Sequence, residues 1–88
     1  MNPTALLTTA AALADPTRLL LLCALGSGPK TVNQLVGPAH VSQPSVSYHV
    51  RRLREAGLVR IERHGRCTLV QRNEHTWRMI LGVFAPAE

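Results

Sequence analysis

The chain has 88 residues and a formal net charge of +5, so it can form one domain with one modest hydrophobic core. Hydrophobic residues make up 45% of it and aromatic residues only 3%, which favours helices packed through aliphatic side chains over a large sheet. Cys23 and Cys67 lack CxxC spacing, which argues against a zinc ribbon or a disulfide framework and favours a reducing compartment.

Two helices are predicted in the first third of the chain. Residues 4–14 carry Ala and Leu at helical spacing with little charge opposite them, so we expect a partner to cover this helix. Asp15 can cap a second helix over residues 16–25, and Pro16 suits its first position because no amide donor is needed there. The second helix has a nearly continuous apolar surface, so we expect it to be the central core helix. Its apolar side chains include Leu19, Leu20, Leu22, Cys23 and Leu25.

A helix-turn-helix unit is predicted in the middle of the chain. Its first helix covers residues 31–36 and is expected to stop at Gly37-Pro38. Ser42 can cap the second helix, which runs to residue 56 and closes on Gly57. Two helices of this length joined by a short turn that contains glycine are typical of this unit. The inward side chains of the second helix are Val46, Val50 and Leu53.

After residue 57 the apolar period changes from helical to alternating, which predicts a two-stranded hairpin. The pair His64-Gly65 is a tight-turn signal and is expected at its centre. In that arrangement Val59 and Ile61 face the same side as two residues of the second strand. Those two residues are Cys67 and Leu69.

A last helix is predicted over residues 74–84. The predicted fold class is therefore mainly α with a small β-hairpin, in the arrangement of a winged helix-turn-helix. We expect one domain over residues 1–88. The apolar stripes of the first and last helices are large for peripheral elements. We therefore expect these helices to pack across the two-fold axis of a homodimer. The side chains expected in that interface are Leu6, Leu7, Leu13, Trp77, Ile80, Leu81 and Phe84.

Positive charge is concentrated in one third of the chain. Residues 51–78 contain eight arginines and three glutamates, a net of 8 − 3 = +5, whereas residues 1–50 carry a net of +1. A basic block confined to one part of a small domain indicates a phosphate-binding face. The alternative is a solvated surface, in which Arg51, Arg54 and Arg60 serve solubility or pair with Glu55 and Glu62.

Three motifs resemble the ArsR/SmtB family of bacterial winged-helix repressors. They are LADPTRLLLL at 13–22, VSQPSVSYHVRRLREAGLVR at 41–60 and the basic turn RHGR at 63–66. The resemblance implies a homodimer joined through its terminal helices, operator DNA that is released when an inducer binds, and base contacts from Gln43, Ser47 and Tyr48. Pro44 departs from the small polar residue that many relatives carry at that position.

The residues themselves agree with a double-stranded DNA partner. Short hydrogen-bonding side chains at the start of a recognition helix let the backbone approach base edges in the major groove. Arginines further along the same helix are expected to bind phosphate, and those of the hairpin tip to lie over the adjacent minor groove. The predicted DNA-binding residues are Gln43, Ser45, Ser47, Tyr48, His49, Arg51, Arg52, Arg63, His64 and Arg66.

No inducer is identified by the sequence, and neither a metal site nor a cofactor is predicted. Many relatives bind metal through a Cys-x-Cys pair, and Thr31 and Asn33 stand where those thiolates would be. Asn73 and His75 correspond to only the first half of a second metal site found in the family. A redox pair formed by the two cysteines is a further alternative, although a thiol on an apolar helix is normally inert.

The main competing function is an architectural DNA binder or a protein-contact module without an inducer. A steep loss of DNA affinity with salt would distinguish DNA binding from protein contact. An enzyme is not expected, because no paired carboxylates, nucleophile triad or phosphate-binding glycine loop occurs. The sequence shows no signal peptide, and its longest apolar stretch, residues 19–25, is too short for a membrane span, so we expect a cytoplasmic protein.

Overall fold

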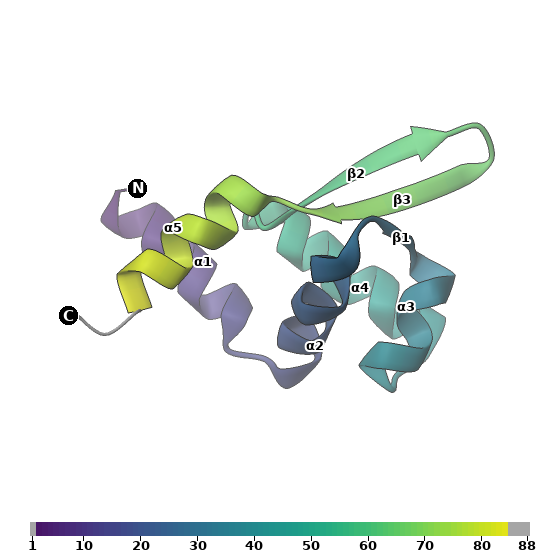
Figure 1. The fold of residues 1–88 in the computed structure, drawn as a ribbon. Helices are drawn as coiled ribbons and strands as arrows, with labels where there is room; N and C mark the ends of the chain where they lie inside the picture. Colours follow the sequence, from purple (N-terminus) through teal and green to yellow (C-terminus); the bar gives the residue numbers. More distant parts are fainter. Residues whose placement is uncertain (1, 85–88) are drawn as a thin grey trace.

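The computed structural model describes residues 2–84, with the backbone alone at residue 84. Helices gather at one end and in the middle, and a long hairpin projects beyond them at the other end (Figure 1). The winged-helix fold class predicted from the sequence is confirmed. The elements are α1 (Pro3–Leu13), α2 (Pro16–Ala24), a 3-10 turn (Leu25–Ser27), β1 (Lys30–Thr31), α3 (Val32–Ala39), α4 (Gln43–Glu55), β2 (Val59–His64), β3 (Cys67–Arg72) and α5 (Glu74–Phe84).

Side-chain caps fix where the helices begin. The Asp15 carboxylate accepts the amide of Arg18 at 3.0 Å at the start of α2, as the sequence predicts. Ser42 caps α4 in the same way. At α3 the Thr31 hydroxyl accepts the Gln34 amide at 3.2 Å, and the Gln34 side chain accepts the Thr31 amide at 2.9 Å, which completes a capping box.

The predicted end of α3 is wrong. The helix continues through residues 37 and 38 to Ala39 and ends where His40 adopts a left-handed conformation with φ of 57°. Pro38 lies in the last turn of the helix, where its missing amide removes only one hydrogen bond. The His40 amide then bonds the carbonyls of Val36 and Gly37, which closes the helix end.

The sheet has three antiparallel strands in the order β1-β3-β2 rather than the two that the sequence predicts. Strand β1 pairs Lys30 with Val70 and Thr31 with Leu69. Two residues are too few to show an alternating pattern, so this strand has no sequence signal of its own.

The predicted position of the hairpin turn is also wrong by one residue, which shifts each cross-strand partner by two residues. The turn residues are Gly65 and Arg66, so His64 pairs with Cys67 and Ile61 pairs with Val70. Gly65 has a φ of 61° and comes first in the turn, as in a type II′ turn. Because residues directly opposite each other share a face, Val70 lies on the side of Val59 and Ile61 and is buried, so the expectation that Cys67 and Leu69 share that side is wrong.

The core lies where α2, α3 and α4 pack beneath the sheet. Leu21, Leu22 and Leu25 are buried, which confirms α2 as a core helix. Its apolar surface is not buried all the way round, because Leu19, Leu20 and Cys23 are exposed. One face of a nine-residue helix meets α3 and α4, and the opposite face has no covering element among residues 2–84.

Arg72 joins three elements from a largely buried position. Its Nη1 donates to the Leu22 carbonyl at 2.9 Å, and its Nε and Nη2 donate to Glu74 at 2.8 and 3.2 Å. The guanidinium also lies over the Trp77 ring, 4.7 Å from the centroid. Only 13% of the Arg72 side chain is exposed, so this arginine of the basic block serves the fold.

No single described helix is long and apolar enough to cross a membrane. The segments Pro3–Leu13 and Pro16–Ser27 reach that length and composition only when taken together across a bend of 93°.

Candidate nucleic-acid interface

Burial of one stripe fixes the rotation of α4. Val46, Val50 and Leu53 are buried, so the remaining side chains fall on three sides of the helix at 100° per residue. The side toward α3 and β2 carries Gln43, Ser47, Arg51 and Arg54. The outer side carries Pro44, Tyr48 and Glu55, and the side toward α1 carries Ser45, His49 and Arg52.

A hollow of about 180 Å³ lies between α3, α4 and β2, and we call it the arginine groove. Ser47, Arg51 and Arg54 line it from α4. Neither Arg51 nor Arg54 forms an ion pair with any described residue, so both guanidinium groups are available to an outside anion. The groove is lined by Val32, Ser47, Val50, Arg51, Arg54 and Ile61.

Arg54 is absent from the DNA-binding residues predicted from the sequence. It lies one turn after Val50 and only about 80° from the buried Val46, on the same side as Ser47. A helical projection anchored on the three buried positions would have found it. The order of the arginines along the chain does not distinguish the two sides of the helix.

The start of α4 presents polar groups to solvent. Gln43 and Tyr48 are exposed, and the Tyr48 ring meets the His49 ring edge-on with 5.1 Å between centroids. Ser45 is half-buried, and its hydroxyl lies 3.2 Å from the Ser42 hydroxyl. The Ser45 amide donates to the same Ser42 oxygen at 3.5 Å, so the expected structural role of Ser42 as a cap is confirmed.

His49 is oriented differently from the exposed residues of α4. Its ring is half-buried, and its Nδ1 is buried with no hydrogen-bond partner among the described residues. The pKa of Asp15 lies below its ordinary value chiefly because the carboxylate accepts the Arg18 amide, and the nearby charge of His49 lowers this pKa further. His49 therefore lies close to the start of α2 and not on the outer side of α4.

Arg52 does not reach the arginine groove. Its Nη1 is 3.5 Å from Oε2 of Glu55, and both side chains are about half exposed. It lines a different pocket, between α4, α1 and the start of α2, together with Arg18. The structure thus brings Arg51 and Arg54 together and places Arg52 on the other side of the helix.

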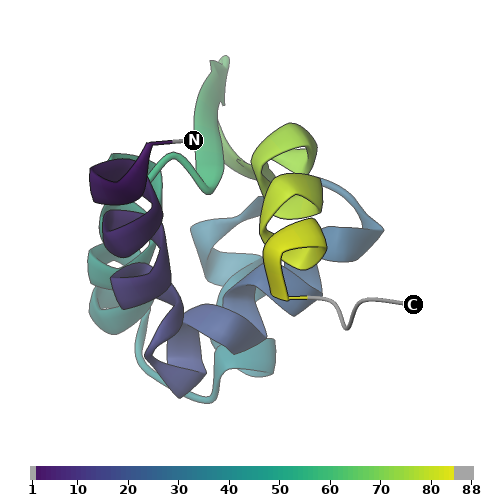
Figure 2. The same cartoon turned by 90° about the vertical axis from the view of Figure 1, so that its left-hand side faces the viewer.

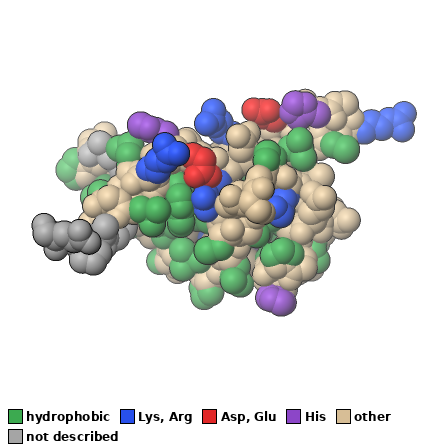
Figure 3. Space-filling model, viewed as in Figure 1, with side chains coloured by type: hydrophobic (Ala, Val, Ile, Leu, Met, Phe, Trp, Pro, Cys, Tyr) green, Lys and Arg blue, Asp and Glu red, His purple; other side chains and the backbone are tan. Residues whose placement is uncertain are grey.

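The hairpin tip carries a second group of positive charge. Arg63, His64 and Arg66 are all exposed there, and Figure 3 shows basic side chains at the far end of the projection. The His64 Nε2 lies 3.1 Å from a Glu62 oxygen, so one acidic side chain faces this tip.

The residues predicted for a dimer interface divide into two groups. Leu7 and Leu81 are 70% and 50% exposed, and Leu6 is half-buried. Leu13 and Trp77 pack partly against the core of the protomer itself. The Phe84 side chain lies outside the described residues.

Ile80 requires a correction. It is only 3% exposed and belongs to the protomer core, because α5 turns this side chain inward, so its burial does not depend on a partner. Val83, which is absent from the predicted interface, is 56% exposed on the same helix. Its spacing from residues 79 and 80 is helical, and this signal was available in the sequence.

The positions of the family metal sites have structural roles here. Thr31 forms the capping box of α3, and the Asn73 side chain accepts the Thr76 amide at 3.3 Å while donating to the Gly57 carbonyl at 3.1 Å. Within residues 2–84 no three His, Cys, Asp or Glu side chains come together as a metal site. Cys23 and Cys67 are both free and exposed.

A helix-turn-helix followed by a hairpin wing and flanked by helices α1 and α5 defines a winged helix-turn-helix protein. Residues 15–60 match the model of the family described as bacterial regulatory protein, arsR family. The chain belongs to this family.

Two named relatives illustrate the similarity. The transcriptional repressor SmtB of Mycobacterium tuberculosis H37Rv is 41% identical over 64 residues, which cover 73% of this chain and 47% of the relative. A probable mercury resistance operon repressor of Streptomyces lividans is 46% identical over 55 residues, or 62% of this chain and 44% of the relative. The chain spans about half the length of the curated relatives it matches.

Solved structures show the same fold. The crystal structure of an ArsR family transcriptional regulator superposes with a TM-score of 0.81 at 30% identity, covering 97% of this chain and 88% of the other. A homodimeric winged helix-turn-helix DNA-binding domain from Mycobacterium bovis superposes with a TM-score of 0.82 at 23% identity, covering 91% and 75%.

Proposed function

We propose that this protein is a sequence-specific regulator that binds double-stranded DNA and represses transcription as a homodimer. The observation that carries the proposal is the arginine groove, where Ser47 and two guanidinium groups without an ion-pair partner among residues 2–84 line the side of α4 next to the wing. The named relatives are transcriptional repressors, which supports the same activity for this chain. Because DNA lies in the cytoplasm of a bacterial cell, this function implies a cytoplasmic protein. Its activity would be regulation and not catalysis.

The side chains of α4 and of the wing have different roles in DNA recognition. Gln43 has the amide that matches the N6 and N7 edge of adenine, and Ser47 and Tyr48 lie within the next two turns of the helix. The guanidinium groups of Arg51 and Arg54 bind phosphate, which supplies affinity without sequence preference. The exposed basic tip of the hairpin lies over the neighbouring minor groove.

The second copy of the chain packs against α1 and α5. Figures 1 and 2 place these two helices together at the end of the molecule opposite the hairpin tip. An apolar pocket of about 240 Å³ separates them, and the exposed Leu7, Leu81 and Val83 lie on the same two helices. A second protomer would remove this apolar surface from water. The pocket is lined by Leu6, Met79, Ile80, Gly82 and Val83.

The test is a fluorescence-anisotropy titration of the full chain against two duplexes across a salt series. One duplex is the genomic fragment upstream of the protein's own gene, and the other is a random sequence of equal length. We expect tighter binding to the upstream fragment and a steep loss of affinity for both duplexes with salt. Weak and equal binding to the two duplexes would overturn the repressor assignment.

Two variants separate base reading from phosphate binding in the same assay. Gln43→Ala should reduce the preference for the upstream fragment, because a good bidentate contact supplies about 1–3 kcal/mol of discrimination. Arg51→Ala should weaken binding to both duplexes alike. Equal losses on both duplexes for Gln43→Ala would refute the role assigned to that residue.

A further inference from the structure

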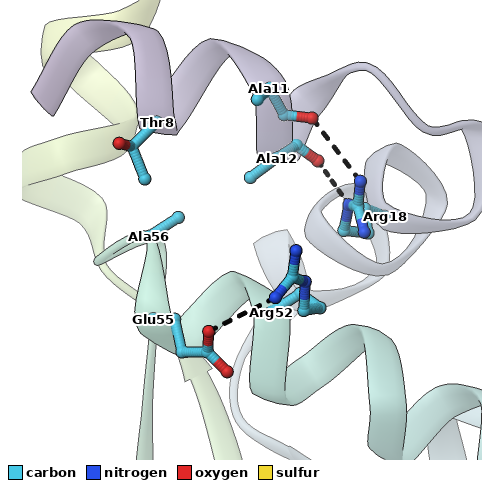
Figure 4. Close-up of a pocket in the computed structure, with 7 residues that line it drawn as sticks. All are labelled: Thr8, Ala11, Ala12, Arg18, Arg52, Glu55 and Ala56. Carbon is cyan, nitrogen blue, oxygen red and sulfur yellow. Dashed lines mark hydrogen bonds and ion pairs between the residues drawn. The ribbon is translucent and has the colours of Figure 1, made fainter. Parts of the chain in front are cut away.

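A pocket of about 300 Å³ lies on the side of α4 away from the arginine groove, and we call it the alanine pocket. It opens between the last two turns of α1, the start of α2 and the end of α4 (Figure 4). Small side chains leave this space open, because Ala11 and Ala12 face Ala56 across it. The pocket is lined by Thr8, Ala11, Ala12, Arg18, Arg52, Glu55 and Ala56.

Two arginines supply positive charge to this pocket. Arg18 is half-buried, and its Nε donates to the Ala12 carbonyl at 2.6 Å while its Nη2 lies 3.5 Å from the Ala11 carbonyl. These contacts hold the guanidinium against the end of α1, where the partial negative charge of the helix terminus stabilises it. Its Nη1 has no acceptor among the described residues, so this group can donate to a ligand.

Arg52 approaches from α4 and has one weak partner in the pocket. The 3.5 Å contact with Glu55 is long for a charge-assisted hydrogen bond, and both side chains are open to solvent. Its remaining guanidinium donors are therefore accessible to a competing anion. Two guanidinium groups and one carboxylate give the pocket a net positive charge of one.

The lining thus combines charged side chains with a net charge of +1 on one side and the methyl groups of alanines on the other. A guanidinium fork matches the two oxygens of a carboxylate, and the alanine methyl groups match a short hydrocarbon body. The volume is at the lower end of the range for small-molecule sites. We propose that the alanine pocket binds a small monocarboxylic acid with a short aliphatic body, held by Arg18 and Arg52.

This site goes beyond the proposed DNA-binding function, and its occupancy is measured without DNA. The probes are the straight-chain monocarboxylates from acetate to octanoate, added to the 88-residue chain and followed by ¹H–¹⁵N NMR, including the arginine Nε–H signals. Affinity should rise about fourfold for each added methylene until the alanine methyl groups are covered. Shifts should concentrate at Arg18, Arg52 and residues 8–12.

Hexanamide and inorganic phosphate serve as comparison ligands. The amide keeps the hydrocarbon body without the charge, and phosphate keeps a charge without the body. Both should bind at least tenfold more weakly than hexanoate. Binding of phosphate as tight as that of hexanoate would overturn the proposal, because an unspecific anion site would then explain the result.

Variants locate the site within the fold. Ala11→Leu fills the pocket with a good helix former and should abolish the shifts, whereas Ala5→Leu makes the same change on an exposed part of α1 outside the pocket. Identical hexanoate binding by these two variants would overturn the assignment. The ¹H–¹⁵N spectrum of each variant also reports whether it folds.

Variants that change the charge of the alanine pocket should change the affinity for hexanoate in opposite directions. Arg52→Gln should weaken hexanoate binding about tenfold or more, because it removes a charge-assisted contact. Arg60→Gln removes the same charge from an exposed strand position outside the pocket and should change the affinity less than twofold. Glu55→Gln should tighten binding severalfold, because it removes the carboxylate that competes for Arg52. Weaker binding by Glu55→Gln would contradict this arrangement.

Discussion

Arg54→Gln tests which side of α4 meets the phosphate backbone. Arg54 lines the arginine groove without an ion-pair partner among residues 2–84, so its full charge is available to DNA. Each phosphate contact contributes about 0.9 to the slope of log affinity against log salt concentration. A dimer loses two such contacts, so the slope should become shallower by about 1.8.

The size of the effect follows from this slope. Between 50 and 200 mM salt, a fourfold change, the wild-type protein should lose about tenfold more affinity than Arg54→Gln. The assay is anisotropy of a labelled duplex at several salt concentrations, with each variant first confirmed as a dimer by sedimentation.

Arg52→Gln provides the matched comparison, because it removes the same charge two residues away on the other side of the helix. In a buffer free of carboxylates its slope should change much less. If Arg52→Gln flattens the slope as much as Arg54→Gln, the arginine groove is not the side of α4 that faces DNA.

Three further results are expected. Leu81→Asp places a charge on the exposed apolar surface of α5 and should shift the dimer toward monomer in sedimentation velocity without changing the far-UV circular dichroism of the protomer. Arg72→Met leaves the Leu22 carbonyl without its charged donor and should lower the free energy of unfolding by about 2–3 kcal/mol, measured by urea denaturation, whereas an unchanged midpoint would contradict the role of Arg72 in the fold. Because the pKa of Asp15 is depressed in the folded protein, its carboxylate adds stability above the ordinary pKa of 3.8 that is lost as the pH falls through the lower folded value. Asp15→Asn keeps a good cap but cannot titrate, so the stability difference between wild type and variant should be constant above about pH 5 and shrink in more acidic buffer.

Local signals in the sequence were sufficient for the order of the helices and of the two hairpin strands, although not for the short strand β1. Asp15 and Ser42 occupy the cap positions that their side chains predict, because a cap depends on residues only three apart. The buried stripe of α4 follows directly from apolar spacing. These features need no knowledge of what lies elsewhere in the chain.

Features that depend on distant pairing were not predictable in the same way. The choice between His64-Gly65 and Gly65-Arg66 as the turn pair decides which residue of β3 lies opposite each residue of β2, yet both pairs contain the glycine that signals the turn. The role of Arg72 depends on the Leu22 carbonyl, fifty positions earlier in the chain. Composition alone groups this arginine with the phosphate-binding block.

The contacts of Arg72 also bear on how the two protomers of the proposed dimer would be spaced on DNA. Arg72 is the last residue of the wing strand β3. Its side chain donates hydrogen bonds to the Leu22 carbonyl near the end of α2 and to Glu74, the first residue of α5. If α5 rotates relative to the second protomer, the base of the wing must therefore move with it, unless these hydrogen bonds break. In the proposed dimer, the packing angle of the terminal helices would therefore set the distance between the two wings, and a change in that angle would alter which half-site spacing the protein accepts.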